Sequence, residues 1–345
     1  MICSDLFIAL SSAALAVAFI TMESVPTWFI YCIIFARGIG MVFHGISFQA
    51  SIPLFTPTDK LVQVGGWGQI VNGAANLIGP ALGALLIMHL SMEYVMYVDI
   101  FGAVSAVVCL LLVKFEDVAK NAEEQAKSDF GGEFKQGIRT LKANKPLLIA
   151  TTHGTITGSL YFPLNALFLL LVAAHYGGTE LQASYVEVAA AAGVIIGALI
   201  IGKIGDIKYK LRTFSLSIIF VGISTFIMGI LPSSLFGFCV VLVLLFGIAI
   251  PFFQVPYNTY VQTYIPKEEM GRVFSVYFML CCIGNPIGLL LDGPIGDKIG
   301  VASMFVYLGI LLALNGLICL IRVRLPEKDF IRDYNKNNSS ENNII

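Results

Sequence analysis

Four ionisable residues lie inside long apolar stretches of the 345-residue sequence, where such residue types are rare: Arg37, His44, Asp99 and Glu187. An arginine placed this deep needs a polar partner or a cavity, because its charge costs at least ~2.5 kcal/mol in hydrocarbon. His44 follows Arg37 by seven residues, which is two helical turns along the same face. Such side chains can carry protons across a membrane, or they can form ion pairs that only hold helices together. For His44 a further alternative is a hydrogen bond to a carbonyl group.

A second group of side chains could line an aqueous cavity. Gln69, Asn72 and Asn76 recur at helical spacing and form one polar stripe, which either faces a cavity or hydrogen-bonds to neighbouring helices. Later in the chain, aromatic rings alternate with amides, a mixture that suits a bulky amphipathic solute, although packing against lipid explains most of the rings. This later set consists of Tyr161, Phe162, Asn165, Phe252, Phe253, Gln254, Tyr257 and Asn258.

Two stripes of small residues predict close helix packing. The segment 72–86, "NGAANLIGPALGALL", carries a Gly-Pro pair that weakens a helix, so we expect a compensating contact. Its stripe consists of Ala75, Gly79 and Gly83, with Ala84 beside Pro80 and Gly83. A second stripe consists of Ala189, Gly193 and Gly197. We predict that these two helices cross tightly at an interface between two halves, with Pro80 bending the first helix. Close packing without any gating role is the alternative.

The hydrophilic loop 202–212, "GKIGDIKYKLR", combines an acid near a helix end with several basic residues. Gly202 and Asp206 are followed by Lys208, Lys210 and Arg212. An acid in this position can make charge-assisted hydrogen bonds to the other half of a bundle and hold one side closed. The alternative is an ordinary basic loop on the cytoplasmic side of a membrane.

Residue types needed for catalysis are not grouped in this sequence. The four histidines fall on separate segments, and no nucleophile–base pair or metal-ligand set stands out. The seven cysteines lack metal-like spacing, which favours a role in packing. The sequence has no phosphate-binding loop. We therefore expect neither an enzyme nor a cofactor, and we expect no metal and no nucleic-acid partner.

The composition defines the elements that position these residues. Apolar residues make up 57% of the chain and charged residues 12%, against roughly 25% charged residues in soluble domains. Segments of around 20 apolar residues recur, long enough to cross a membrane. We predict a polytopic, all-α membrane protein with ten spans near residues 5–22, 27–53, 65–89, 92–113, 146–174, 181–203, 213–231, 234–262, 272–293 and 300–321.

Basic residues predict the orientation of the chain. The connectors on one side and the C-terminal tail hold 19 of the 21 lysines and arginines, so both termini are expected in the cytoplasm. We divide the chain into an incomplete N-terminal half of four helices (1–113), a connector (114–145), a six-helix half (146–322) and a cytoplasmic tail (323–345). Within the connector, Phe130, Phe134, Ile138 and Leu141 recur at helical spacing. They predict an amphipathic helix on the cytoplasmic leaflet, or else a solvated linker.

An internal repeat relates the two halves. A shift of 209 residues aligns the stretch from Gly38 with that from Gly247 without gaps, through two helices and a loop. Pro57 aligns with Pro266, and the identities continue to Asn76 and Asn285. Both copies run in the same direction across the membrane, which is typical of parallel repeats in transporters. The first copy lacks two helices that the second copy has at its start.

At this point the chain resembles the major facilitator superfamily, within the drug:proton antiporter branch that includes macrolide efflux proteins. The resemblance rests on "RGIGMVFHGISFQASIPLFTP" and "NLIGPALGALL", which correspond to that branch's fourth and fifth helices. It implies a bundle of twelve helices, of which the third to the twelfth are present here. We therefore expect a late start of the reading frame, or a natural short form. The resemblance also implies that Arg37 takes part in proton transfer and that Gly202 and Asp206 belong to a degenerate gating motif.

The resemblance and the residues together predict a secondary active transporter. We expect export of bulky hydrophobic, macrolide-like solutes by proton antiport with alternating access, with Arg37, His44, Asp99 and Glu187 in coupling or translocation. The expected partners are the lipid bilayer, a hydrophobic solute and protons, and the energy source is the proton gradient. We expect a monomer in the cell membrane. The alternatives are export of a native metabolite such as a siderophore or lipid, and a truncated membrane protein that does not transport.

Overall fold

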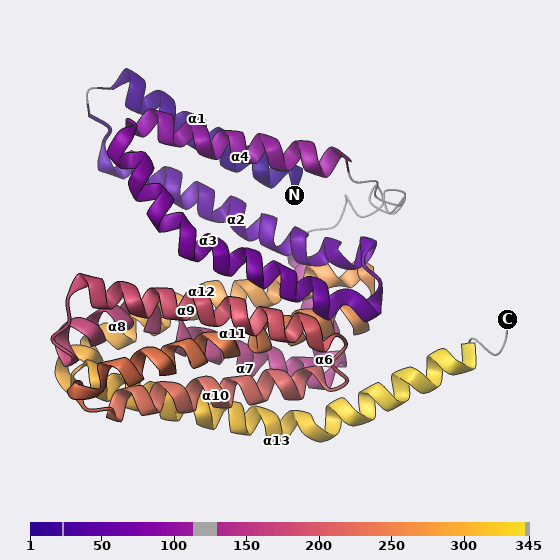
Figure 1. The fold of residues 1–345 in the computed structure, drawn as a ribbon. Coiled ribbons are helices and arrows are strands. Elements are labelled where there is room, and N and C mark those ends of the chain that lie inside the picture. The colour runs from indigo at the N-terminus through magenta and orange to yellow at the C-terminus, as the bar shows by residue number, and fades with distance from the viewer. Residues whose placement is uncertain (23, 113–129, 342–345) are drawn as a thin grey trace. The chain divides into compact units, whose positions relative to one another are not determined.

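A computed structural model describes residues 1–22, 24–112 and 130–341, and every regular element in these ranges is helical (Figure 1). The main helices are α1 (Ile2–Thr21), α2 (Thr27–Phe55), α3 (Leu61–His89), α4 (Met92–Leu112), α6 (Phe130–Ala143), α7 (Lys145–Tyr161), α8 (Leu164–Leu170), α9 (Glu180–Ile204), α10 (Lys210–Ile230), α11 (Phe236–Tyr264), α12 (Lys267–Ile299) and α13 (Val301–Glu341). Within the described ranges, eight helices are long and apolar enough to cross a membrane, and α4 contains a shorter apolar stretch, Tyr94–Leu110. The prediction of an all-α membrane fold is confirmed.

Two predicted segments differ from the observed helices. The span expected at 146–174 is divided into α7, α8 and a π-helical turn, Leu171–His175, because Pro163 cannot donate a backbone hydrogen bond at the break. The span expected at 300–321 continues as one helix, α13, to Glu341. Residues 113–129 of the predicted connector lie outside the described residues.

The helix bounds reproduce the internal repeat. Adding 209 to the bounds of α2 gives those of α11, and both helices have 29 residues. The same shift places α1 on α10 to within one residue at its start. The pattern of neighbours also repeats, because α1 packs on α2 and α4 whereas α10 packs on α11 and α13. The two copies therefore form the same local structure from largely different residues.

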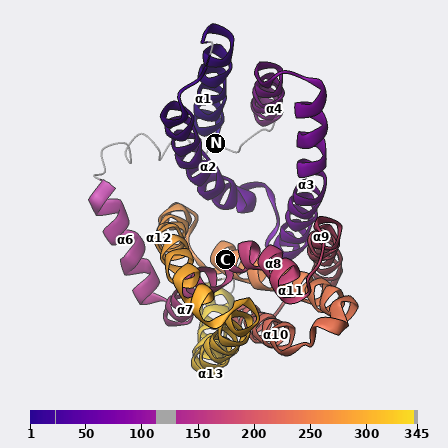
Figure 2. The ribbon, with the colours of Figure 1, turned by 90° about the vertical axis from the view of Figure 1, so that its left-hand side faces the viewer.

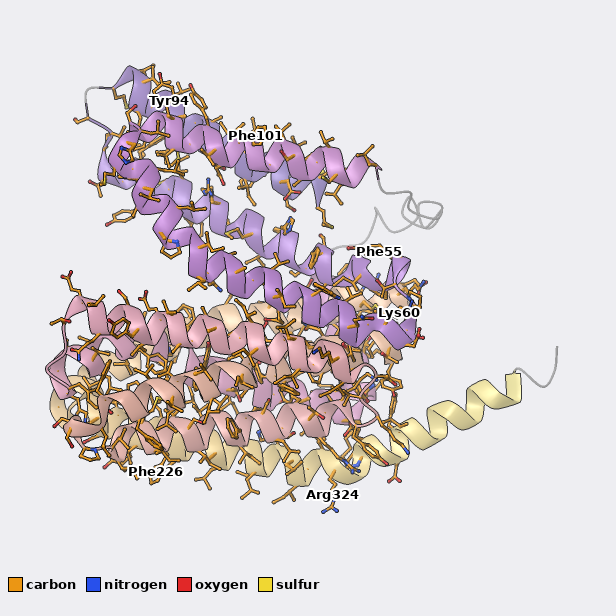
Figure 3. The ribbon with its side chains drawn as sticks, viewed as in Figure 1. Phe55, Lys60, Tyr94, Phe101, Phe226 and Arg324 are labelled. Atoms are coloured by element: carbon orange, nitrogen blue, oxygen red, sulfur yellow. The ribbon has the colours of Figure 1, made fainter. Side chains whose placement is uncertain are left out.

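The chain divides into two compact units, each described by itself. Unit 1 comprises residues 1–55 and 78–132, and unit 2 comprises residues 56–77 and 133–345, so that α3 contributes to both. In unit 1, large apolar side chains of α4 point outward, as Figure 3 shows for Tyr94 and Phe101. Phe101 is 74% exposed. Such rings suit contact with lipid.

The core of unit 2 lies between α7, α8, α9, α10, α11 and α13. Met228, Phe246 and Phe305 are buried within one apolar cluster there. Helices α10 and α13 lie side by side (Figures 1 and 2) and approach closely at Gly222 and Gly309. A Cβ atom on Gly222 would lie 2.3 Å from the backbone nitrogen of Ala313, so only glycine permits this contact.

The amphipathic helix α6 packs on protein. Glu133 pairs with Arg272 of α12 through two contacts of 2.8 and 3.0 Å, and Thr140 donates a hydrogen bond of 2.6 Å to Glu269. Gly137 lies against the backbone of Arg272, and Leu141 is buried. The segment is helical as expected, and the side that carries Leu141 packs into unit 2. The position of α6 on the cytoplasmic leaflet stays a prediction.

Candidate functional site

A polar cluster joins three helices of unit 1. Arg37 of α2 forms an ion pair of 2.5 Å with Asp99 of α4, between Nη1 and Oδ2. Ser12 of α1 donates a hydrogen bond of 2.5 Å to the same carboxylate oxygen and also accepts one from Arg37. Ser12 is buried, whereas the side chains of Arg37 and Asp99 keep 28% and 38% of their surface exposed. Two of the predicted coupling residues are thus brought together.

A second acid–base pair lies two helical turns away, on α1 and α2. His44 Nδ1 lies 2.7 Å from Asp5 Oδ1, and the side chain of Asp5 is 8% exposed. The other carboxylate oxygen of Asp5 has no hydrogen-bond partner among the described residues. Asp5 precedes Ser12 by seven residues on α1, and Arg37 precedes His44 by seven on α2. The two layers therefore lie about 10 Å apart along the α1–α2 contact.

The two layers differ in what they can do chemically. Arginine stays protonated in proteins, so Arg37 supplies a fixed positive charge, and any proton exchanged in its layer belongs to Asp99. The other layer places the imidazole of His44 beside the carboxylate of Asp5. Sequence reasoning did not assign a role to Asp5 or Ser12. The feature of the sequence that could have pointed to Asp5 and Ser12 is their seven-residue spacing, which equals the spacing of Arg37 and His44.

The small-residue stripe of α9 has a different partner from the predicted one. Cβ atoms on Gly193 and Gly197 would lie 2.2 and 2.3 Å from the carbonyl oxygens of Leu244 and Ile248, so this stripe packs closely on α11. Ala189 is buried in the core of unit 2. The assignment of Gly193 and Gly197 to a contact with Ala75, Gly79 and Gly83 is therefore wrong, because the α11 backbone occupies that side of α9.

Helix α3 does pack closely on α9, but through other glycines. In unit 2, a Cβ atom on Gly66 would lie 3.0 Å from the Cα of Gly202, and one on Gly73 would meet Ile195 at 2.9 Å. Gln69 lies between these two positions and is buried. Gly202 is thus part of a helix–helix contact. Its role in gating stays a prediction.

The Gly-Pro segment of α3 remains helical. Pro80 lies inside the helix. A Cβ atom added at Gly79 or at Gly83 would have no atom of unit 1 within 4 Å among the described residues. Ala75 is exposed. The gating role of Ala75, Gly79, Pro80 and Gly83 stays a prediction.

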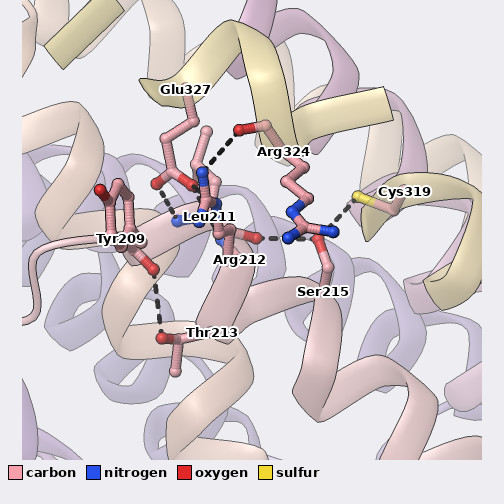
Figure 4. A network of polar contacts seen from close by, with 8 residues as sticks. All are labelled: Tyr209, Leu211, Arg212, Thr213, Ser215, Cys319, Arg324 and Glu327. Atoms are coloured by element: carbon pink, nitrogen blue, oxygen red, sulfur yellow. Dashed lines mark hydrogen bonds and ion pairs between the residues drawn. The ribbon is translucent and has the colours of Figure 1, made fainter. Parts of the chain in front are cut away.

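The loop after α9 is held within unit 2. Asp206 accepts a hydrogen bond of 2.9 Å from Lys210, one helical turn later. Glu327 of α13 is fully buried and accepts hydrogen bonds from the backbone of Leu211 at 2.7 Å and of Arg212 at 3.2 Å (Figure 4). The guanidinium of Arg212 lies over the ring of Tyr209 and donates to the carbonyl of Arg324. A closing role for Asp206 stays a prediction. No motif or spacing in the sequence pointed to a role for Glu327.

The predicted cavity residues fall into different environments. Gln69 donates a hydrogen bond of 2.9 Å to Gln254, which joins α3 to α11 in unit 2. Asn72, Asn76 and Phe162 are exposed, and Phe252 packs partly buried against Val255 and Ile201. Asn258 and Phe253 are partly buried, and the side chain of Asn165 lies outside the described residues.

Tyr257 is a packing residue. Its side chain is 2% exposed, its hydroxyl lies 2.9 Å from that of Thr151, and its ring packs on Tyr277 at 4.6 Å between centroids. Its placement in a solute cavity is therefore wrong, since no face of the ring is accessible. Tyr161 and Glu187, in contrast, line a cavity of about 220 Å³ in unit 2.

No group of three or more histidine, cysteine, aspartate or glutamate side chains in the described ranges could hold a metal ion. The polar sites are pairs and triads on apolar helices, and two of them contain acids beside basic groups. Such arrangements are typical of membrane transport proteins.

The model of the Major Facilitator Superfamily matches residues 1–289 and, in a second overlapping match, residues 164–342. The chain belongs to this superfamily and is therefore a multi-pass membrane transporter. It is 31% identical to Macrolide efflux protein A of Streptococcus pyogenes over 92% of this chain and 78% of the relative. It is 32% identical to the Enterococcus faecalis protein of the same name, over 84% of this chain and 89% of the relative.

Solved structures share the fold. The human organic anion transporter MFSD10 superposes with a TM-score of 0.70 over 92% of this chain and 76% of that one, at 15% identity. The transporter FucP in its outward conformation superposes with a TM-score of 0.62 over 93% of this chain and 82% of that one, also at 15% identity.

Proposed function

We propose that this transporter exports bulky hydrophobic, macrolide-like solutes from the cell in exchange for protons. Two relatives above 30% identity are named for macrolide efflux, and a 23% identical relative from Mycobacterium tuberculosis is named a multidrug efflux pump. The proposed setting is the cell membrane, with both termini in the cytoplasm and the proton gradient as the only energy source. The two halves, as a monomer, alternate in opening to either side of the membrane.

The observation that carries the proton part of this proposal is the cluster of Ser12, Arg37 and Asp99. A carboxylate beside a permanent cation holds its negative charge. When a proton from water binds Asp99, the attraction to Arg37 is lost, and the contact between α2 and α4 is weakened. Release of that proton restores the contact. Proton binding is thereby converted into a change in helix packing, which is what a coupled exchanger requires.

The layer of Asp5 and His44 gives the proton a second position. It lies about 10 Å along the same helix contact, and Asp5 has one oxygen without a partner among the described residues. A proton leaving Asp99 can pass through water molecules toward this pair. We propose that the two layers together form the proton route of unit 1, with no metal or organic cofactor.

The test uses everted vesicles from a bacterial host whose own drug exporters are deleted. With an acidic lumen, vesicles that contain this chain are expected to accumulate erythromycin above vesicles with an empty vector. Addition of erythromycin should release protons from the lumen, and a protonophore should abolish accumulation. Accumulation that persists with the protonophore would contradict proton coupling. Absence of accumulation for erythromycin, ethidium and a lipophilic amine alike would contradict drug export.

A further inference from the structure

Helix α6 meets the rest of unit 2 through one side. Glu133, Gly137 and Thr140 follow one another at intervals of four and three residues, which places them on one face of the helix. Thr140 donates to Glu269 of α12, and a Cβ atom on Gly137 would lie 3.0 Å from Val276, roughly 14 Å from the start of α12. The apolar stretch of α12 that could cross a membrane begins at the start of this helix. We therefore expect α6 at the level of the lipid headgroups on that side of the membrane.

The opposite side of α6 carries three basic residues. Lys135, Arg139 and Lys142 repeat the intervals of four and three residues two positions later, which rotates them by about 200° from the side that meets protein. All three are exposed, and among the described residues none of them has an ion pair or a hydrogen bond. We call these three residues the basic row. Like charges at such intervals destabilise a helix unless an anionic partner lies against them.

An apolar flank lies between the two sides of α6. Phe134 and Ile138 form it, and both are partly exposed. A soluble anion would neutralise the basic row but would leave this flank in water. A neutral lipid surface would cover the flank but would leave the row without a counter-charge. Anionic phospholipids do both, because acyl chains cover the apolar side chains while phosphate groups meet the cations.

We propose that the basic row binds the phosphate groups of anionic phospholipids and thereby holds α6 between the membrane and α12. The leaflet is the one at which α7 and α12 begin, which is the cytoplasmic leaflet in the proposed topology. The inference adds a lipid partner and does not depend on which solute is exported. Arg139 also lines a hollow of about 540 Å³ that Tyr264 and Phe330 share, where a free phosphate compound could bind. The lipid is favoured because Phe134 and Ile138 adjoin the row and do not line the hollow.

The first experiment measures contact between α6 and lipid, with the full chain in nanodiscs. Trp28→Phe and Trp67→Phe remove the two natural tryptophans, and Phe134→Trp places an indole beside the basic row. The discs consist of phosphatidylcholine with an equal small share of either phosphatidylglycerol or phosphatidylcholine that carries brominated acyl chains, which quench indole fluorescence on contact. Brominated phosphatidylglycerol is expected to quench about threefold more strongly. Equal quenching by the two lipids, or no quenching by either, would overturn the proposal.

Variants assign this preference to the basic row. In the single-tryptophan chain, the row is neutralised by Lys135→Gln, Arg139→Gln and Lys142→Gln, and the preference for phosphatidylglycerol should disappear. The matched control removes the same charge from three exposed lysines outside α6, by Lys60→Gln, Lys203→Gln and Lys267→Gln. This control should keep the preference. Equal losses in the two triple variants would show that overall charge attracts the lipid and would overturn the role of the row.

The second experiment uses hydrogen exchange and keeps the natural tryptophans. Backbone amides of α6 should exchange about threefold more slowly in discs with phosphatidylglycerol than in pure phosphatidylcholine. The difference should vanish at 1 M NaCl, where charges are screened beyond ~3 Å. Equal exchange in the two lipids at low salt would contradict the proposal. Millimolar glycerol 1-phosphate in pure phosphatidylcholine is expected to give no protection. Protection by this soluble compound would assign Arg139 to a free phosphate in the hollow and would overturn the assignment to lipid.

Discussion

Asp99 of α4 and Arg37 of α2 form an ion pair of 2.5 Å, and both residues touch the same buried hydroxyl, that of Ser12 on α1. One charge pair therefore ties three helices of unit 1 together. Neither side chain is fully enclosed, and the proposal requires that water reaches the pair from its open side. This combination of a structural tie with access for a proton makes the pair the centre of the proposed coupling.

The first prediction concerns removal of the acid alone. Asp99→Asn leaves the charge of Arg37 without its partner and removes the proton carrier. We expect drug-dependent proton release to fall at least tenfold and the free energy of unfolding to fall by about 1–3 kcal/mol. The double variant Arg37→Gln with Asp99→Asn removes both charges and should recover much of the stability but none of the coupling. Coupling that survives in Asp99→Asn would contradict the proposed proton position.

The second prediction concerns the layer of His44 and Asp5. If the pair exchanges a proton during transport, then Asp5→Asn removes the acceptor and shifts the pH at which exchange is half-maximal. His44→Gln keeps a polar side chain in place and should shift the same profile. The matched control is His89→Gln, which alters a histidine at the end of α3. A pH profile that is identical in all four proteins would restrict the proton route to Asp99.

The third prediction concerns the cap of α10. Glu327 accepts hydrogen bonds from the backbone of Leu211 and Arg212, which would otherwise be unsatisfied at the start of the helix. Glu327→Gln should therefore lower the unfolding temperature in detergent, with a loss of about 1–3 kcal/mol for the buried donors. Glu268→Gln, at an exposed acid in the first turn of α12, should have a smaller effect. Equal effects of the two changes would contradict a capping role.

The fourth prediction concerns the contact between α6 and α12. A Cβ atom on Gly137 would lie 2.8 Å from the carbonyl oxygen of Arg272, so Gly137→Val must push the two helices apart. We expect faster hydrogen exchange in the backbone of α6 and earlier proteolytic cleavage there. Gly132→Val changes the same helix at a position with open space and should have little effect. Unchanged exchange in Gly137→Val would mean that α6 does not depend on this contact.

Much of the fold could be predicted from the sequence, because hydrophobic spacing determines the membrane helices locally. The repeat of α2 as α11 followed from residues such as Pro57 and Pro266, which start the next segment in both copies. The break at Pro163 was harder to predict, since the apolar composition continues through it.

The pairing of side chains was beyond sequence reasoning in most cases. Arg37 and Asp99 were each identifiable by their charge, but nothing in a single sequence indicates that residues 62 positions apart lie in contact. Glu327 lies beyond the apolar part of α13 and resembles a solvated residue, although the fold buries it. Small residues mark close packing without indicating the partner. The α3–α9 contact therefore forms through Gly66 and Gly73, whereas Gly193 and Gly197 pack on α11.

The fifth prediction separates two classes of glycine that look alike in sequence. A Cβ atom added at Gly193 or at Gly197 would lie within 2.3 Å of the α11 backbone. Gly197→Leu should therefore prevent unit 2 from packing and reduce the amount of folded protein. Gly79 and Gly83 have open space in unit 1, so the double change to leucine should leave insertion and folding intact. If the Gly-Pro segment gates transport, this double variant should nevertheless lose erythromycin export.

Size-exclusion profiles measure folding, and the vesicle assay measures export, so the two properties are tested separately. Export at the wild-type rate by the folded double variant would refute the gating role of this segment, and normal folding of Gly197→Leu would refute the close contact between α9 and α11.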